Sequence, residues 1–165
     1  GAAVLRKSDL ATVIAATNTE TDNPLMHGEV TAIFGYYDLP KEQRPPPNEC
    51  VFIATHEPCC LCLSSITWGG WDNFFYFFSY EDTMDAFSIP HDIRLNEEIW
   101  RVQDGEYEHK NRYWCAWHIP ELIARCSAEA RPGLERRAQV LRGTYAQLSA
   151  VYQASKGGGA EIPLA

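Results

Sequence analysis

The order of apolar and polar residues along the chain predicts a mixed α/β domain. Two short segments rich in Ala, Val and Ile, Ala2 to Leu5 and Thr12 to Ala16, flank the turn-like residues Lys7 to Asp9, and this pattern predicts a β-hairpin. Continuous apolar runs at Cys50 to Thr55 and Phe74 to Phe78 predict strands that are buried on both faces, as in a parallel sheet. We therefore expect one sheet with antiparallel and parallel strands.

Two helices are predicted between these strands. Apolar residues recur with helical spacing from His27 to Tyr37, and Cys59 to Trp68 lies between Pro58 and the helix-ending pair Gly69-Gly70. Strands that alternate with helices in this way favour a layered domain in which helices cover the sheet.

The remaining segments are less regular. The proline-rich stretch Pro40 to Pro47 is expected to be a connecting loop, and Asp82 to Ala86 a short helix. Tyr113 to Trp117 fits either an edge strand or a buried aromatic loop, and Ile89 to Lys110 has no clear period. Leu134 to Tyr152 is the clearest helix, and its apolar stripe either packs on the sheet, which we favour, or forms a subunit interface.

Length and composition fit one globular domain over residues 1–165. The chain is 45% hydrophobic and 22% charged, and no apolar run approaches the roughly 20 residues that span a bilayer. We therefore expect no membrane partner. A secretory signal is not recognisable, so we expect a cytoplasmic location, and the start within a strand suggests that residues before Gly1 are missing.

The charge balance argues against a nucleic-acid partner. The 22 acidic and 14 basic residues give a net charge of -8, which should repel phosphates. Several arginines lie near the end of the chain, but glutamates among them offset their positive charge. The residues are Arg125, Arg131, Arg136, Arg137 and Arg142, with Glu121, Glu129 and Glu135. We interpret them as a solvated helix face.

A cluster of cysteines predicts a metal site. Of six cysteines, Cys59, Cys60 and Cys62 lie within four positions, which favours a metal over a disulfide framework. Cys59 and Cys62 share one helix face, and the helix N-terminus favours their thiolates. Together with His27 they offer zinc three ligands and leave a fourth position for water, as in catalytic sites.

Glu29 is the candidate catalytic residue. It follows His27 by two positions, close enough to take a proton from that water and to pass it to a substrate. A structural zinc site would need a fourth Cys or His ligand, for which His56, Cys50 and Cys60 are candidates.

Together, His27-Gly28-Glu29 and Pro58-Cys59-Cys60-Leu61-Cys62 fit the H-x-E and P-C-x-x-C signature of zinc-dependent base deaminases. From Gly1 to about Ile99 the chain resembles the cytidine and deoxycytidylate deaminase superfamily, closest to its guanine and tRNA adenosine deaminases. The resemblance implies a three-layer α/β/α fold with a central mixed sheet of about five strands. Residues 1–99 would form the catalytic core and residues 100–165 a divergent C-terminal helical extension.

The resemblance also implies roles for individual residues. His27, Cys59 and Cys62 would hold zinc while Glu29 moves protons. Other residues would contact the substrate or place backbone near the reacting water; they are Asn18, Trp68 and Asp92 for the substrate, and Gly28 and Pro58 for the water.

The implied activity is hydrolytic deamination of a free nucleobase or nucleoside, with release of ammonia. We favour a guanine-type purine because Ser65 to Trp68 and Tyr76 to Asp82 look more like guanine deaminases. The alternatives are a tRNA adenosine deaminase, a cytosine or cytidine deaminase, and a non-catalytic zinc-binding partner subunit. Superfamily relatives are commonly oligomeric, so we expect a homodimer.

Overall fold

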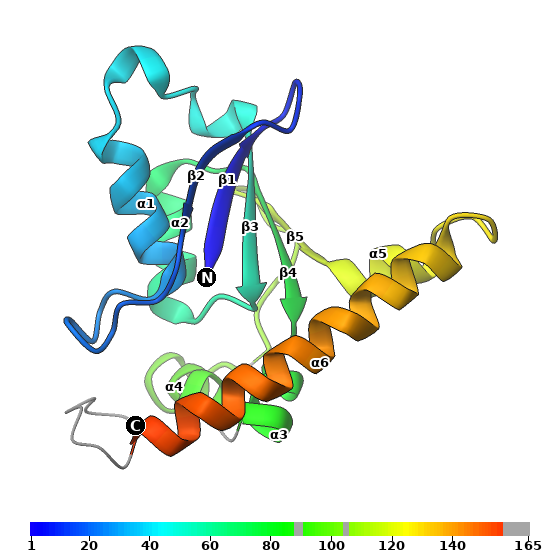
Figure 1. Cartoon of the computed structure of the whole chain (residues 1–165). Coiled ribbons are helices and arrows are strands. Elements are labelled where there is room, and N and C mark those ends of the chain that lie inside the picture. The colour runs from blue at the N-terminus through cyan, green and yellow to red at the C-terminus, as the bar shows by residue number, and fades with distance from the viewer. Residues whose placement is uncertain (88–90, 104–105, 157–165) are drawn as a thin grey trace.

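The fold is built on an open five-stranded sheet with the strand order β2-β1-β3-β4-β5 (Figure 1). The computed structural model describes residues 1–87, 91–103 and 106–156. The strands are β1 (Ala2–Arg6), β2 (Thr12–Ala16), β3 (Cys50–His56), β4 (Asn73–Phe78) and β5 (Cys115–His118). β1 pairs antiparallel with β2 and β3, whereas β3, β4 and β5 run parallel. The predicted mixed sheet and its hairpin are confirmed.

The predicted helices are present in the predicted order, together with two helices, α4 and α5, that were not predicted. They are α1 (Gly28–Asp38), α2 (Cys60–Gly69), α3 (Tyr80–Phe87), α4 (His91–Trp100), α5 (Ile119–Ala124) and α6 (Arg131–Lys156), with short 3-10 turns η1 (Lys41–Gln43) and η2 (Pro47–Glu49). α2 ends as predicted, because Gly70 adopts the left-handed conformation with φ of 85° that glycine accepts without strain. None of the helices in the described ranges combines the length and apolar character needed to cross a membrane.

The main core lies between α1, α2 and one face of the sheet. Val4, Phe52 and Phe74 alternate with less buried neighbours along β1, β3 and β4 and are fully buried. The ring of Trp71 lies edge-on to Phe52 and Tyr36, with centroids 5.2 and 5.1 Å apart. Burying each such side chain stabilises the fold by about 1.5–3 kcal/mol. This core therefore holds α1 and α2, and with them their first turns, in place against the sheet.

α6 crosses the carboxyl ends of β3 and β4 (Figure 1). Ala138 and Tyr145 pack with Phe77 and Phe78, but Leu141 and Leu148 of the same stripe are 36% and 55% exposed. The expectation that the whole stripe packs on the sheet is therefore wrong for part of its length. A helix of 26 residues is about 39 Å long, whereas five strands span only about 19 Å, so α6 overhangs the sheet.

Two irregular segments are now assigned. The segment without a clear period, Ile89 to Lys110, contains α4. The aromatic segment before residue 118 combines both alternatives, since β5 is an edge strand while Trp114 just before it is buried. The predicted loop from Pro40 to Pro47 contains η1 and the beginning of η2.

Candidate metal centre

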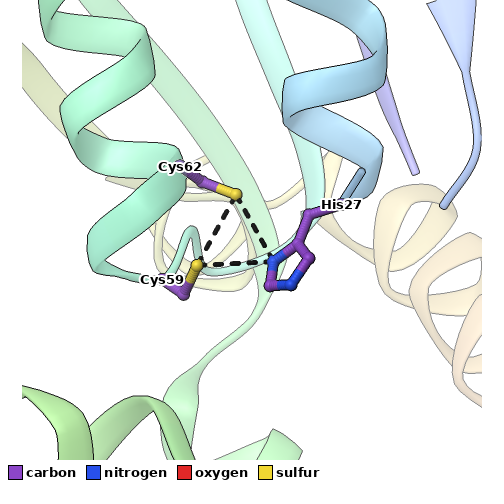
Figure 2. Close-up of side chains that lie close together, drawn as sticks. All are labelled: His27, Cys59 and Cys62. Carbon is purple, nitrogen blue, oxygen red and sulfur yellow. Dashed lines mark hydrogen bonds between the residues drawn. The ribbon is translucent and has the colours of Figure 1, made fainter. Parts of the chain in front are cut away.

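The predicted zinc ligands come together from the first turns of two neighbouring helices (Figure 2). His27 immediately precedes α1, and Cys59 immediately precedes α2, while Cys62 lies one turn further along α2. Neither His27 nor Cys59 caps its own helix with its side chain. Both side chains therefore face the space between the two helices.

The spacing of the three ligand atoms fits a tetrahedral zinc ion. Cys59 Sγ lies 3.4 Å from His27 Nδ1 and 3.6 Å from Cys62 Sγ, and Cys62 Sγ lies 3.7 Å from His27 Nδ1. Zinc bonds of about 2.3 Å to sulfur and about 2.0–2.1 Å to nitrogen, at tetrahedral angles, separate two sulfurs by about 3.8 Å and sulfur from nitrogen by about 3.5–3.6 Å. The residues present therefore fit zinc with little rearrangement.

The number of ligands distinguishes the kind of zinc site. In the described part of the chain, only His27, Cys59 and Cys62 bring three such ligand atoms within 4.8 Å of one another. His56, Cys50 and Cys60, the candidates for a fourth ligand, are not members of this group. Three protein ligands are typical of catalytic zinc, whereas structural zinc is held by four.

The three ligands differ in their proton affinity. A hydrogen bond with Cys59 raises the pKa of His27 to about 9. Hydrogen bonds from Cys62 and His27 hold the pKa of Cys59 far below its usual value, while the hydrogen bond to Cys59 together with burial raises the pKa of Cys62. Zinc binding would therefore displace protons from His27 and Cys62.

Glu29 lies beside this centre without belonging to the ligand group. Its carboxylate accepts a hydrogen bond from the Cys62 thiol at 3.3 Å, and the side chain is buried in the first turn of α1. Burial raises the pKa of Glu29, and a raised carboxyl pKa suits a group that exchanges protons near neutral pH. The geometry therefore suits Glu29 to moving protons next to a metal.

Gly28 and Pro58 both lie in tightly packed backbone. A Cβ atom on Gly28 would lie 2.6 Å from the Cα of Gly1 at the beginning of β1, so the close approach of β1 to α1 requires glycine. Pro58 is fully buried, and its carbonyl accepts a hydrogen bond from the Tyr80 hydroxyl at 2.6 Å.

The predicted substrate residues lie further out. The Asn18 side chain is exposed and accepts a hydrogen bond from the backbone N–H of Glu20. Trp68 is 92% exposed, and nine positions along a helix separate it from Cys59 by about 13 Å. The side chain of Asp92 lies outside the described residues. Substrate contact by these three residues remains a prediction.

The structure places a half-buried histidine, His56, at the end of β3. His56 stacks on Phe78 with ring centroids 4.9 Å apart, and Tyr145 of α6 meets it edge-on at 5.4 Å. Its Nδ1 lies 3.1 Å from the Thr55 hydroxyl. Burial lowers the pKa of His56 to about 4, so the ring is neutral at pH 7.

One family model matches the first part of the chain. Residues 1–78 match the cytidine and deoxycytidylate deaminase zinc-binding region. This agrees with the superfamily resemblance of the motif, and the matched residues include His27, Glu29, Cys59 and Cys62. None of the curated proteins matches the chain.

Several solved structures are similar in part. A guanine deaminase from Nitrosomonas europaea is 18% identical with a TM-score of 0.44, and the match covers 71% of this chain and 63% of that one. A guanine deaminase from Bacillus subtilis is 23% identical with a TM-score of 0.40, covering 68% and 82%. A structure from a study of tRNA:A34 deaminases is 18% identical with a TM-score of 0.39, covering 74% and 79%. The chain thus spans about three fifths of the Nitrosomonas protein.

Proposed function

We propose, from the match of residues 1–78 to the cytidine and deoxycytidylate deaminase zinc-binding family, that this chain is a zinc-dependent hydrolytic deaminase. Its substrate would be a free nucleobase or nucleoside, with a guanine-type purine favoured. One observation carries the proposal: a buried carboxylate, Glu29, lies 3.3 Å from the ligand atom of Cys62 but outside the three-ligand group. A purely structural zinc site is closed by four ligands and needs no neighbouring carboxylate to exchange protons.

The reaction replaces a ring amino group by oxygen, so that substrate and water give the oxo product and ammonia. Zinc, when bound to His27, Cys59 and Cys62, would supply an activated water as the nucleophile. Glu29 would accept one proton from that water and pass it to the ring nitrogen beside the reacting carbon. It would then take the second proton from the hydroxyl that the water has become and pass it to the amino group, so that the carbon–nitrogen bond breaks and ammonia leaves. The burial of Glu29 supports this role because it keeps the carboxyl ready to accept a proton.

A small substrate is supported by charge. The net charge of -8 disfavours binding of a polyanion such as tRNA. The preference for guanine rests on the resemblance of Ser65 to Trp68 and Tyr76 to Asp82 to guanine deaminases. A homodimer and a cytoplasmic location complete the proposal.

The test is ammonia release from guanine, adenine, cytosine, their nucleosides and aminated triazines. The wild-type chain should bind about one zinc ion and release ammonia from at least one of these compounds. Glu29→Gln should keep the zinc but lose at least about 100-fold in turnover, the lower bound for removing a general acid-base group. Glu42→Gln, on the exposed turn η1, is the matched control and should behave as wild type.

Full activity in Glu29→Gln would contradict the mechanism, and no release from any compound would contradict the substrate class. A gel shift with tRNA at low salt separates the main alternative. Binding of tRNA there would favour adenosine editing over a free base.

A further inference from the structure

The two residues before Cys59 are held by side chains from a later part of the chain. Glu57 is almost completely buried, with 5% of its side chain exposed. Its carboxylate accepts a hydrogen bond from the backbone N–H of Tyr80 at 2.9 Å and from the hydroxyl of Tyr107 at 2.8 Å. His109 Nε2 lies 3.3 Å from the same carboxylate. All three partners lie beyond residue 78, where the family match ends.

The backbone of this loop is fixed as well. The N–H of Glu57 donates to the carbonyl of Phe78 at 2.7 Å, and the Tyr80 hydroxyl donates to the carbonyl of Pro58 at 2.6 Å. Cys59 follows directly and begins α2. Because the Cys59 sulfur must stay about 3.6 Å from its partners to bind zinc, a rotation at Glu57 or Pro58 would separate the ligands.

A carboxylate is a costly residue to bury at this point. A buried charge destabilises the fold unless hydrogen bonds compensate it, and an apolar side chain would fill the same space at lower cost. Here the hydrogen bonds that compensate the buried Glu57 carboxylate come from two defined places, the beginning of α3 and the segment around Tyr107. They therefore fix the orientation of the Glu57 side chain. Burial and the neighbouring Glu57 raise the pKa of Tyr107, so its hydroxyl remains a donor.

We propose that Glu57, Tyr107 and His109 are positioning residues of the zinc centre. Tyr107 and His109 hold the Glu57 side chain, and Glu57 in turn fixes the backbone that leads to Cys59. The position of Cys59 relative to Cys62 is thereby fixed as well. The inference rests on the proposed function in one respect, namely that His27, Cys59 and Cys62 are the metal ligands. It gives part of the chain beyond the family match a role in the metal site.

The test uses cobalt(II) as a spectroscopic replacement for zinc in the full chain. Thiolate-to-cobalt charge-transfer bands and ligand-field bands report the ligands and their geometry, and a titration gives the affinity. Tyr107→Phe removes one hydroxyl without changing the ring, and we expect it to weaken cobalt binding about 10-fold and to shift the ligand-field bands. Glu57→Gln should show a larger effect, because every bond to the carboxylate is weakened or lost.

Tyr113→Phe is the matched control, because Tyr113 is 59% exposed and lies in the same later part of the chain. It should bind cobalt as wild type does. Thermal unfolding of the metal-free variants shows whether each one folds; should Glu57→Gln not fold, Tyr107→Phe decides. Wild-type affinity and spectrum in a folded Tyr107→Phe would overturn the positioning role alone, whereas a wild-type chain that binds no cobalt would overturn the proposed metal site as well.

Discussion

Residues 1–78 and residues 79–156 contribute differently to the metal centre. The first part holds His27, Glu29, Cys59 and Cys62, and the largest fully buried side chains, such as Trp71 and Phe52, also lie there. The second part provides no ligand of this centre among the described residues. Its contacts with the first part include the pairing of β5 with β4, the hydrogen bonds to Glu57 and the aromatic packing of α6 on Phe77 and Phe78.

The difference separates two requirements of a metal site. Ligand identity is local, since it is set by two short motifs at helix beginnings on a well-packed core. Ligand geometry depends on the outer contacts that fix the loop before α2, and those contacts come from a segment some fifty residues away, at Tyr107.

The largest expected effect is on metal-dependent stability. A free zinc concentration a thousandfold above the dissociation constant should raise the free energy of unfolding of the wild type by about 4 kcal/mol. Cys62→Ser should lose most of this increment because a hydroxyl is a poor zinc ligand. Chemical unfolding with zinc and with a chelator measures the increment.

Cys60→Ser is the control for this experiment. Cys60 lies between the two ligand cysteines but outside the three-ligand group, so it should keep the zinc increment. An equal loss in both variants would show that the cysteine pair has been assigned wrongly.

An intermediate effect is expected from pH at His56, where the two parts meet. Its pKa is about 4 in the folded chain and about 6.5 when unfolded, so as pH falls below 6.5 the unfolded chain gains a proton that the folded chain does not. The free energy of unfolding therefore has its full contribution from neutral His56 above pH 6.5. By pH 5 this contribution is smaller by about 2 kcal/mol, and it continues to decrease until about pH 4. His56→Gln should remove about that much of the difference in unfolding free energy between pH 7 and pH 5.

An unchanged pH dependence in His56→Gln would mean that the histidine is hydrated in the folded chain. The packing of Tyr145 over His56 would then be looser than the 5.4 Å ring separation indicates.

The smallest effect concerns the ion pair that joins α6 to α3. Arg142 Nη1 lies 2.8 Å from an oxygen of Asp82, and the side chains are 38% and 26% exposed. Partial exposure screens the pair, so a double-mutant cycle with Arg142→Gln and Asp82→Asn should give a coupling of at most about 1 kcal/mol. A coupling of several kcal/mol would show that charge, and not the rings around Phe78, mainly holds α6 in place.

Local patterns were sufficient to predict the hairpin, the helices beginning near His27 and Cys59, and the grouping of His27, Cys59 and Cys62 as side chains that could hold a metal ion. Helical period, proline and glycine boundaries and motif spacing are all properties of neighbouring residues. α4 was not predicted because the segment that contains it, Ile89 to Lys110, mixes charged and aromatic residues without a clear period. The bonds of Glu57 to Tyr107 and His109 could not be predicted, since no local pattern specifies a contact across fifty residues.

We expect Cys59, Cys62 and His27 to hold a zinc ion in an open site. X-ray absorption at the zinc edge of the zinc-loaded chain measures this directly. The spectrum should show two sulfur neighbours at about 2.3 Å and two nitrogen or oxygen neighbours at about 2.0–2.1 Å, with the multiple-scattering signature of one imidazole. Three or four sulfur neighbours, or a second imidazole, would instead show a closed structural site and rule out the open one.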